Sequence, residues 1–287
     1  TWEASLDCLQ RRGLMVSFGN ASGPVTGVIV GPLLGGLMAD HLGLRVVFFV
    51  TAVLMFVSFL ITLFLIKERH IEVKKADRLS GKAVFQSLPY PALIVTLFVS
   101  TLMIQLANSS ISPILTLFIK DLSGDSGNLA FISGMIAAVP GVAALMSAPR
   151  LGRLGDRIGT ARILLAALGL TTVLFAIMAW VETPLQLGIL RFLLGFADGA
   201  LMPAVQTLLL KYSSDQVTGR IFGYNQSFMY LGNVVGPLIG SGVSALMGFR
   251  WVFVVTAVLV LINCLQLRSQ FNKVEAKSSP SGQEGER

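Results

Sequence analysis

Charged residues are scarce in this sequence. They make up 13% of its 287 residues, whereas globular domains carry about 25%. Hydrophobic residues reach 54% of the chain, and its mean hydropathy is +0.75. This composition excludes an ordinary water-soluble domain and predicts a chain that is largely solvated by lipid.

Cysteine and histidine are also rare, with two residues of each type. Cys8 and Cys264 lie far apart without a CxxC pattern, which argues against a disulfide framework and a thiolate metal site. His41 and His70 both fall in predicted loops and form no cluster of ligands. No nucleophile motif or pair of carboxylates lies at membrane depth either, so the sequence argues against a membrane-embedded enzyme. We expect no cofactor and no metal.

Long apolar runs dominate what is present. A helix needs about 20 residues to cross the hydrocarbon core of a bilayer, and eight runs come near that length. They are residues 14–38, 44–66, 91–119, 129–149, 160–180, 185–210, 221–246 and 251–267. The predicted fold class is therefore an all-α, multi-pass integral membrane protein.

The positive charges indicate an orientation. Most of the 22 lysines and arginines fall in alternate connections between the predicted spans. The other set of connections holds only Arg45, Lys120 and Arg250, and Arg191 lies within a span. The positive-inside rule then places both termini in the cytoplasm. The net charge of +7 therefore reflects the basic residues of the cytoplasmic connections. For this reason we expect no nucleic-acid partner.

Glycine recurs at every fourth position from Gly19 to Gly35. On a helix this spacing puts the five glycines on one face, which lets another helix approach closely in lipid. Pro24 and Pro32 lie in the same segment. Membrane helices tolerate such prolines as bends when neighbouring groups satisfy the freed carbonyls.

Part of this segment occurs twice. Residues 31–54 and 236–259 align without a gap, and 13 of the 24 positions are identical. If the repeat unit is six helices, residues 1–66 hold the last two helices of a first bundle and residues 89–270 a complete second bundle. Residues 67–88 form a central cytoplasmic loop, and residues 271–287 a cytoplasmic tail that we expect to be disordered. The chain starts without methionine, and we expect four further helices to precede it in a twelve-helix protein.

Two motifs and the repeat resemble the major facilitator superfamily. In that superfamily a glycine motif marks the fifth helix of the drug/proton antiporters, and its matching residues here are Gly27, Gly31, Pro32, Gly35 and Gly36. A second motif, GRLGDRIG, resembles the superfamily's cytoplasmic loop motif between helices eight and nine. Its matching residues are Gly152, Leu154, Asp156, Arg157 and Gly159.

The resemblance implies a function. It implies a secondary transporter of the bacterial inner membrane, monomeric when full length, which exports hydrophobic or amphiphilic drugs in exchange for protons. The family's first-half loop motif and its fourth-helix arginine have no counterpart in this chain. A proton-coupled metabolite transporter of the same fold, and a non-transporting receptor or assembly subunit, are the alternatives.

Arg191 and Asp198 are the two ionisable residues that lie well within predicted spans. Charge in a membrane is costly, so each is a candidate for proton coupling or gating. They are two helical turns apart on one face, which is too far for a direct ion pair without water or side-chain reach. The alternative is that Arg191 snorkels to the interface and Asp198 caps a neighbouring helix.

Asp156 and Arg157 are the gating candidates of the second motif. A carboxylate in a short loop can meet the positive end of a neighbouring helix dipole. By pseudo-symmetry that neighbour is the start of the span at residues 14–38. We therefore expect Asp156 to latch the cytoplasmic side in the outward-facing state.

Amides and a tyrosine within the spans form the third set of candidates, because such groups need a partner or water in lipid. They could line a substrate cavity, although contacts between helices are their commoner role. The cavity candidates are Gln105, Asn108, Asn225, Gln226, Tyr230 and Asn233.

The glycines also predict packing. The strip of residues 14–38 should lie against small residues of the span at 129–149, namely Ser133, Gly134, Ala137, Ala138 and Gly141. A second strip, Gly232, Gly236 and Gly240, should have its partner in the preceding helices and so face lipid here. For the same reason we expect residues 1–287 alone to insert but not to transport.

Overall fold

The computed structural model describes residues 34–39, 43–65, 88–123, 129–213 and 217–278. Residues 34–39 are helical. The longer helices are α2 (Leu44–Leu65), α4 (Pro91–Ile111), α5 (Leu115–Ser123), α6 (Leu129–Ile158), α7 (Thr160–Met178), α8 (Pro184–Tyr212), α9 (Thr218–Met247) and α10 (Phe249–Ser278). Within this described part, seven helices are long and apolar enough to cross a membrane. The all-helical, multi-pass prediction is confirmed, while most of the span at 14–38 lies outside the described residues.

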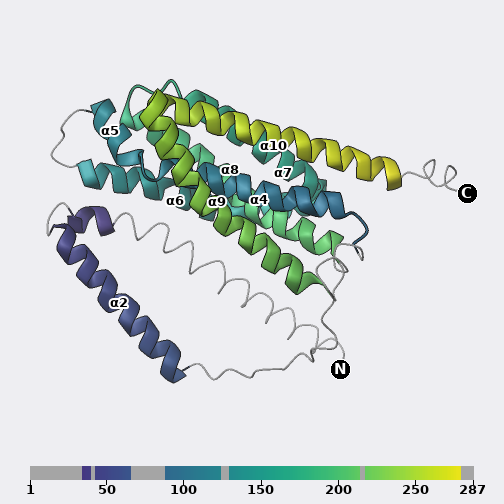
Figure 1. The fold of residues 1–287 in the computed structure, drawn as a ribbon, viewed down its shortest axis with the longest axis horizontal. Coiled ribbons are helices and arrows are strands. Elements are labelled where there is room, and N and C mark those ends of the chain that lie inside the picture. The colour runs from purple at the N-terminus through teal and green to yellow at the C-terminus, as the bar shows by residue number, and fades with distance from the viewer. Residues whose placement is uncertain (1–33, 40–42, 66–87, 124–128, 214–216, 279–287) are drawn as a thin grey trace, which may run out of the picture.

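Helices α4 to α10 form one bundle (Figure 1). The most extensive contacts are those of α6 with α8 and of α4 with α9, and α7 packs between α8 and α10. Large side chains such as Phe98, Phe175 and Phe253 are fully buried in its core. No residue from Arg45 to Phe64 of α2 is buried, and this helix stands apart from the bundle in Figure 1.

The predicted span at 91–119 is broken in the structure. Helix α4 ends at Ile111, a turn follows over residues 112–114, and α5 begins at Leu115. Pro113 explains the break, because it has no N–H to donate to the carbonyl four residues earlier. The sequence predicted one unbroken span because average hydropathy does not depend on the direction of the chain.

The second motif is mostly helical, contrary to the loop expected for it. Helix α6 continues to Ile158, and Gly159 alone separates it from α7. Gly159 has a φ of +101°, and its N–H donates to the carbonyl of Gly155 at 2.9 Å. Glycine adopts this positive φ without the strain that a side chain would add. The turn between the two spans therefore needs only one residue.

Two further boundaries are explained by local chemistry. Helix α8 begins with a capping box, in which the Thr183 hydroxyl accepts from the Gln186 N–H and the Gln186 side chain accepts from the Thr183 N–H, both at 3.3 Å. Helix α10 continues to Ser278, so residues 271–278 are helical rather than part of a disordered tail. The tail from residue 279 onward lies outside the described residues.

The second glycine strip has a partner within the bundle. A Cβ on Gly232 would lie 2.6 Å from the Leu102 carbonyl oxygen of α4, and one on Gly236 would lie 2.8 Å from that of Leu106. Gly240 lies closer still to the backbone of Ser110. The expectation that this strip faces lipid was wrong. Its glycines let the α4 and α9 backbones touch, which is the role of small residues between membrane helices.

The first strip is described only at its end. Gly27, Gly31 and Pro32 lie outside the described residues. Gly36 is close to α6, since a Cβ there would lie 2.9 Å from the Ala130 carbonyl oxygen. Gly36 is not one of the five strip glycines. The one strip glycine that the structure describes, Gly35, has no atom within 4 Å of a Cβ. The packing of the remaining glycines stays a prediction.

The α9 strip supplies a testable prediction of stability. We expect Gly240→Ala to destabilise the bundle by about 1–3 kcal/mol, because the added methyl group would overlap the Ser110 backbone. Gly242→Ala is the matched control, since no atom lies within 4 Å of a Cβ at that position of the same helix. Thermal unfolding of residues 1–287 in detergent measures both. Equal melting temperatures for the two variants would contradict the close contact.

Candidate functional site

A row of polar side chains runs along one face of α4. Its members are spaced by four, three and one residues, which keeps them on one side of the helix. They are Thr101, Gln105, Asn108 and Ser109. The helices that receive them are α8 and α9. This row is the centre of the candidate site, because each of its members meets a polar group on one of these neighbours.

Asn233 of α9 holds two members of the row. Its Oδ1 accepts a hydrogen bond from Gln105 Nε2 at 2.7 Å and a second from Ser109 Oγ at 2.9 Å. These side chains are half-buried or exposed at one side of the α4–α9 contact. Gln105 and Asn233 were predicted to line a cavity. The structure brings them together and gives them a second role, as partners across two helices.

Asn225 lies deeper in the same contact. It is 5% exposed, and its Oδ1 accepts from the Thr101 hydroxyl at 2.7 Å. Beside this bond, Phe98 stacks on Phe228 with ring centroids 5.4 Å apart. These residues therefore join α4 to α9 and do not present a surface to a ligand. In this arrangement Asn225 serves as a contact between helices, and its role as a cavity residue stays a prediction.

The open face of α9 carries the remaining candidates. Gln226, Tyr230 and Asn233 are exposed and follow one another at spacings of four and three residues. They form a stripe along the helix. Among the described residues, the Gln226 side chain makes one polar contact, a long one of 3.9 Å from its Nε2 to the Met229 sulfur. The stripe is free to contact a molecule that lies against this face.

Asn108 connects the row to Asp198. The Asn108 side chain lies close enough to the Asp198 carboxyl of α8 to interact with it. The positive charge of Arg191 on the same helix is near enough to interact with this carboxyl. The site thus combines an ionisable acid, an amide and a guanidinium at membrane depth, where such groups are costly unless they have a function.

Arg191 leaves hydrogen-bonding capacity unused. Its Nε and Nη1 atoms are buried and have no partner among the described residues. They do not reach out to an interface as a snorkelling side chain would. The electrostatic attraction to Asp198 therefore acts without a direct hydrogen bond from either of these two nitrogens.

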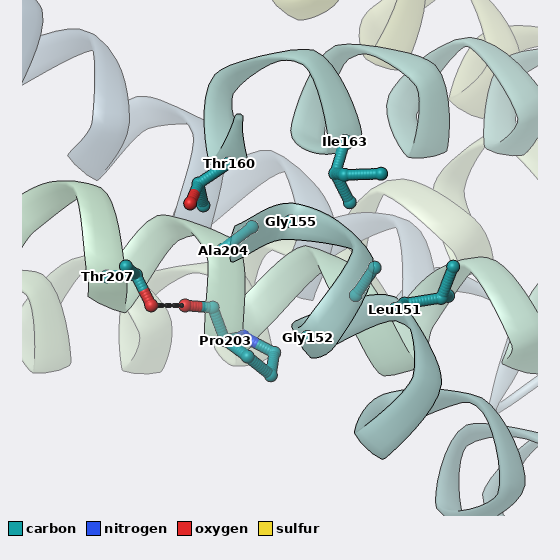
Figure 2. A pocket seen from close by; sticks show the side chains of 9 residues that line it. Leu151, Gly152, Gly155, Thr160, Ile163, Pro203, Ala204 and Thr207 are labelled. Carbon is teal, nitrogen blue, oxygen red and sulfur yellow. Dashed lines mark hydrogen bonds between the residues drawn. The ribbon is translucent and has the colours of Figure 1, made fainter. Parts of the chain in front are cut away.

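The second motif encloses a small cavity between α6, α7 and α8 (Figure 2). Its volume is about 110 Å³, and its lining residues are Leu151, Gly152, Gly155, Thr160, Ile163, Ala200, Pro203, Ala204 and Thr207. The Thr207 hydroxyl donates to the Pro203 carbonyl at 2.8 Å across one turn of α8. The motif's glycines leave space at this end of the bundle, and sequence reasoning did not associate Pro203 or Thr207 with them.

The two gating candidates of that motif lie in the last turn of α6. Arg157 is exposed there. The Asp156 side chain lies outside what the structure describes, as does the start of the span at 14–38. The latch between them therefore remains a prediction.

Thr101 and Thr256 are site neighbours that the sequence analysis missed. Thr101 is one turn before Gln105, so helical periodicity could have included it. The Thr256 hydroxyl of α10 lies 3.3 Å from that of Ser110, and no local pattern relates residues so far apart. In the part of the chain that the structure describes, no group of three or more His, Cys, Asp or Glu side chains could hold a metal ion.

The bonds of Asn233 lead to a second prediction of stability. Asn233→Leu removes the acceptor of two hydrogen bonds between helices, each worth about 0.6 kcal/mol on average in membrane proteins. We expect a destabilisation of about 1 kcal/mol, measured as a lower melting temperature in detergent. Gln226→Leu is the control on the same helix and should change stability less. A larger effect at Gln226 would mean that the α4–α9 bonds contribute little.

Comparisons with known proteins agree with this architecture. The sequence profile described as Major Facilitator Superfamily matches residues 9–131 and residues 97–286. The chain is 58% identical over 259 residues to the multidrug resistance protein MdtG of Klebsiella pneumoniae, covering 90% of this chain and 63% of the relative. It is 60% identical over 245 residues to the MdtG of Yersinia enterocolitica, covering 85% of this chain and 59% of that relative.

A solved structure shows the same fold. The chain superposes on a crystal structure of the peptide transporter POT, an E310Q mutant with sulfate, with a TM-score of 0.57 over 67% of this chain and 41% of the transporter. The two sequences are 19% identical, so this likeness concerns the fold alone. The chain spans about three fifths of the length of the curated relatives that it matches.

Proposed function

Because the chain belongs to the Major Facilitator Superfamily, we propose that the full-length protein exports small hydrophobic or amphiphilic drugs in exchange for protons. The multidrug resistance proteins that it resembles over most of its length support this substrate class. The observation that carries the proposal is the Asp198 carboxyl, which lies at membrane depth between Asn108 and Arg191. This membership also argues against a membrane-embedded enzyme.

The proton site follows from the chemistry of these three groups. An ionised Asp198 accepts hydrogen bonds only, and it is stabilised by the Asn108 amide and by the charge of Arg191. A proton on Asp198 removes the negative charge and weakens both interactions. Since Asn108 lies on α4 and Asp198 on α8, protonation changes the interaction between two helices. Such a change is what couples proton binding to a rearrangement of helices.

The substrate surface is the open stripe of α9. Tyr230 supplies an aromatic face, and Gln226 and Asn233 supply amides that both donate and accept. A mixed surface of this kind fits ligands that are apolar over most of their area and carry a few polar groups. It lies on the same side of α4 as the Asn233 hydrogen bonds, next to the row that reaches Asp198.

The same proposal includes the setting of the protein in the cell. We place it in the bacterial inner membrane, because its relatives are enterobacterial multidrug resistance proteins. Its C-terminus faces the cytoplasm, because of the distribution of its basic residues. It works as a monomer, in which two six-helix bundles rock about a site between them. Residues 89–270 are the second of these bundles.

An accumulation assay tests the direction and the energy source together. Cells that express the full-length protein should accumulate less of a fluorescent amphiphilic dye than cells with an empty vector. An uncoupler should raise their accumulation to the vector level, because it removes the proton gradient. A proton-coupled importer would show the opposite sign before the uncoupler is added. A receptor or assembly subunit would show no difference at either stage, and either outcome would refute the proposal.

A further inference from the structure

Three arginines gather at the C-terminal end of α6. Arg150, Arg153 and Arg157 are exposed and lie at spacings of three and four residues, hence on one side of the helix. Together with Leu154 they line an open hollow of about 310 Å³. No carboxylate is among the described residues that line it. We refer to this feature as the arginine hollow.

Two of the guanidinium groups are held in place by their own helix. Arg150 Nη1 donates to the Met146 carbonyl at 3.1 Å, and Arg153 Nε donates to the Pro149 carbonyl at 3.2 Å. Each bond occupies one of the five N–H donors of a guanidinium. The remaining donors have no hydrogen-bond partner among the described side chains, which do not include Asp156. Their planar arrangement matches the oxygens of a phosphate.

The length of α6 places the hollow at the bilayer surface. Its 30 residues extend about 45 Å at 1.5 Å per residue, which exceeds the hydrocarbon thickness of about 30 Å. The apolar part of α6 begins at Leu129, so the arginines emerge at the level of the lipid headgroups. Leu154 and Ile158, which are 41% and 46% exposed, add an apolar surface beside the charges.

We propose that the arginine hollow binds the phosphate group of an anionic phospholipid, whose acyl chains cover Leu154 and Ile158. Basic pockets at the ends of membrane helices bind such headgroups by charge and by hydrogen bonds. The apolar neighbours and the depth favour a lipid over a free phosphate ion, which would gain nothing from either. The orientation proposed above puts the hollow in the cytoplasmic leaflet, but binding of the lipid does not depend on drug export.

Native mass spectrometry of residues 1–287 in detergent tests this site. The probes are tetraoleoyl cardiolipin, dioleoyl phosphatidylglycerol and dioleoyl phosphatidylethanolamine. We expect both anionic lipids to bind at least about tenfold more tightly than the zwitterionic one. The variant Arg150→Gln/Arg153→Gln should bind the anionic lipids about 30-fold more weakly, from the loss of two cations near the headgroup.

The matched control removes the same charge elsewhere. Lys211 and Arg220 are exposed at the connection between α8 and α9, and the proposed orientation puts them on the same side of the membrane. Lys211→Gln/Arg220→Gln should weaken lipid binding less than about twofold if the hollow is a defined site. Circular dichroism should show unchanged helix content in both variants, because all four side chains are exposed.

Three results would overturn the proposal. Equal weakening by the control would mean that net charge alone attracts the lipid. Equal affinity for phosphatidylethanolamine would remove the need for an anionic headgroup. Displacement of the lipid by millimolar inorganic phosphate would make the hollow a site for free anions instead.

Discussion

Replacing Asp198 by asparagine is expected to abolish proton-driven export by the full-length protein while leaving it inserted in the membrane. Asparagine has the shape of the carboxyl group but neither its charge nor a proton to exchange. The interaction with Asn108 can persist as an amide pair, so the helices need not separate. Export against a gradient should fall to the level of vesicles without the protein.

The test separates coupling from binding. In inside-out vesicles with an imposed proton gradient, dye uptake by the Asp198→Asn protein should match that of empty vesicles. Equilibration of dye down its own gradient should continue, because the substrate stripe of α9 is unchanged. Asp198→Glu keeps an ionisable group and should retain part of the driven uptake. Undiminished driven uptake by the asparagine variant at equal expression would exclude Asp198 from the mechanism.

The spans could be predicted because one physical requirement determines them. Every backbone polar group in lipid must be bonded internally, so long apolar segments become helices. Six of the predicted spans correspond to α2 and α6 to α10, although α6 and α10 continue to Ile158 and Ser278, beyond the predicted ends at residues 149 and 267. The break at Pro113 was not predicted, because average hydropathy does not depend on the direction of the chain. The helical structure of the second motif was not predicted, because its glycines favour a loop. In the structure Gly159 alone forms the turn, so the rest of the motif can be helical.

The candidate site was predictable in part. Charge inside a span pointed to Arg191 and Asp198 without any knowledge of their surroundings. Asn108 was recognised as polar, but its position beside Asp198 depends on how α4 meets α8, which no local pattern encodes. Asn225 and Tyr230 lie five residues apart, and the structure buries one and exposes the other. Their different roles follow from the rotation of α9 against α4.

The glycine strips predicted close helix contacts but not the helices that make them. Spacing at every fourth residue predicts that a helix approaches closely, and α9 confirms this at Gly232, Gly236 and Gly240. Spacing does not name the partner, because any backbone can come near a face without side chains. The repeat suggested a helix outside this chain, whereas α4 occupies the face.

Helices α6 and α8 approach each other backbone to backbone at Gly195. A Cβ on Gly195 of α8 would overlap the backbone of Pro140 on α6, and one on Gly199 would lie 2.8 Å from the Ala144 carbonyl oxygen. The obstacle at Gly195 is main chain, so no change of side-chain rotamer on α6 can relieve it. Because α6 and α8 share one of the most extensive contacts of the bundle, their separation would loosen its core.

We therefore expect Gly195→Ala to destabilise residues 1–287 by about 3 kcal/mol, the upper end for an overpacked contact. This corresponds to a melting temperature lower by about 10 °C for a protein of this size. Gly169→Ala is the control, since this glycine lies within α7 and no atom is within 4 Å of a Cβ there. Both variants should insert, because the hydrogen bonds within each helix are unchanged. Melting of Gly195→Ala at the temperature of the unsubstituted chain would show that α6 and α8 do not meet backbone to backbone.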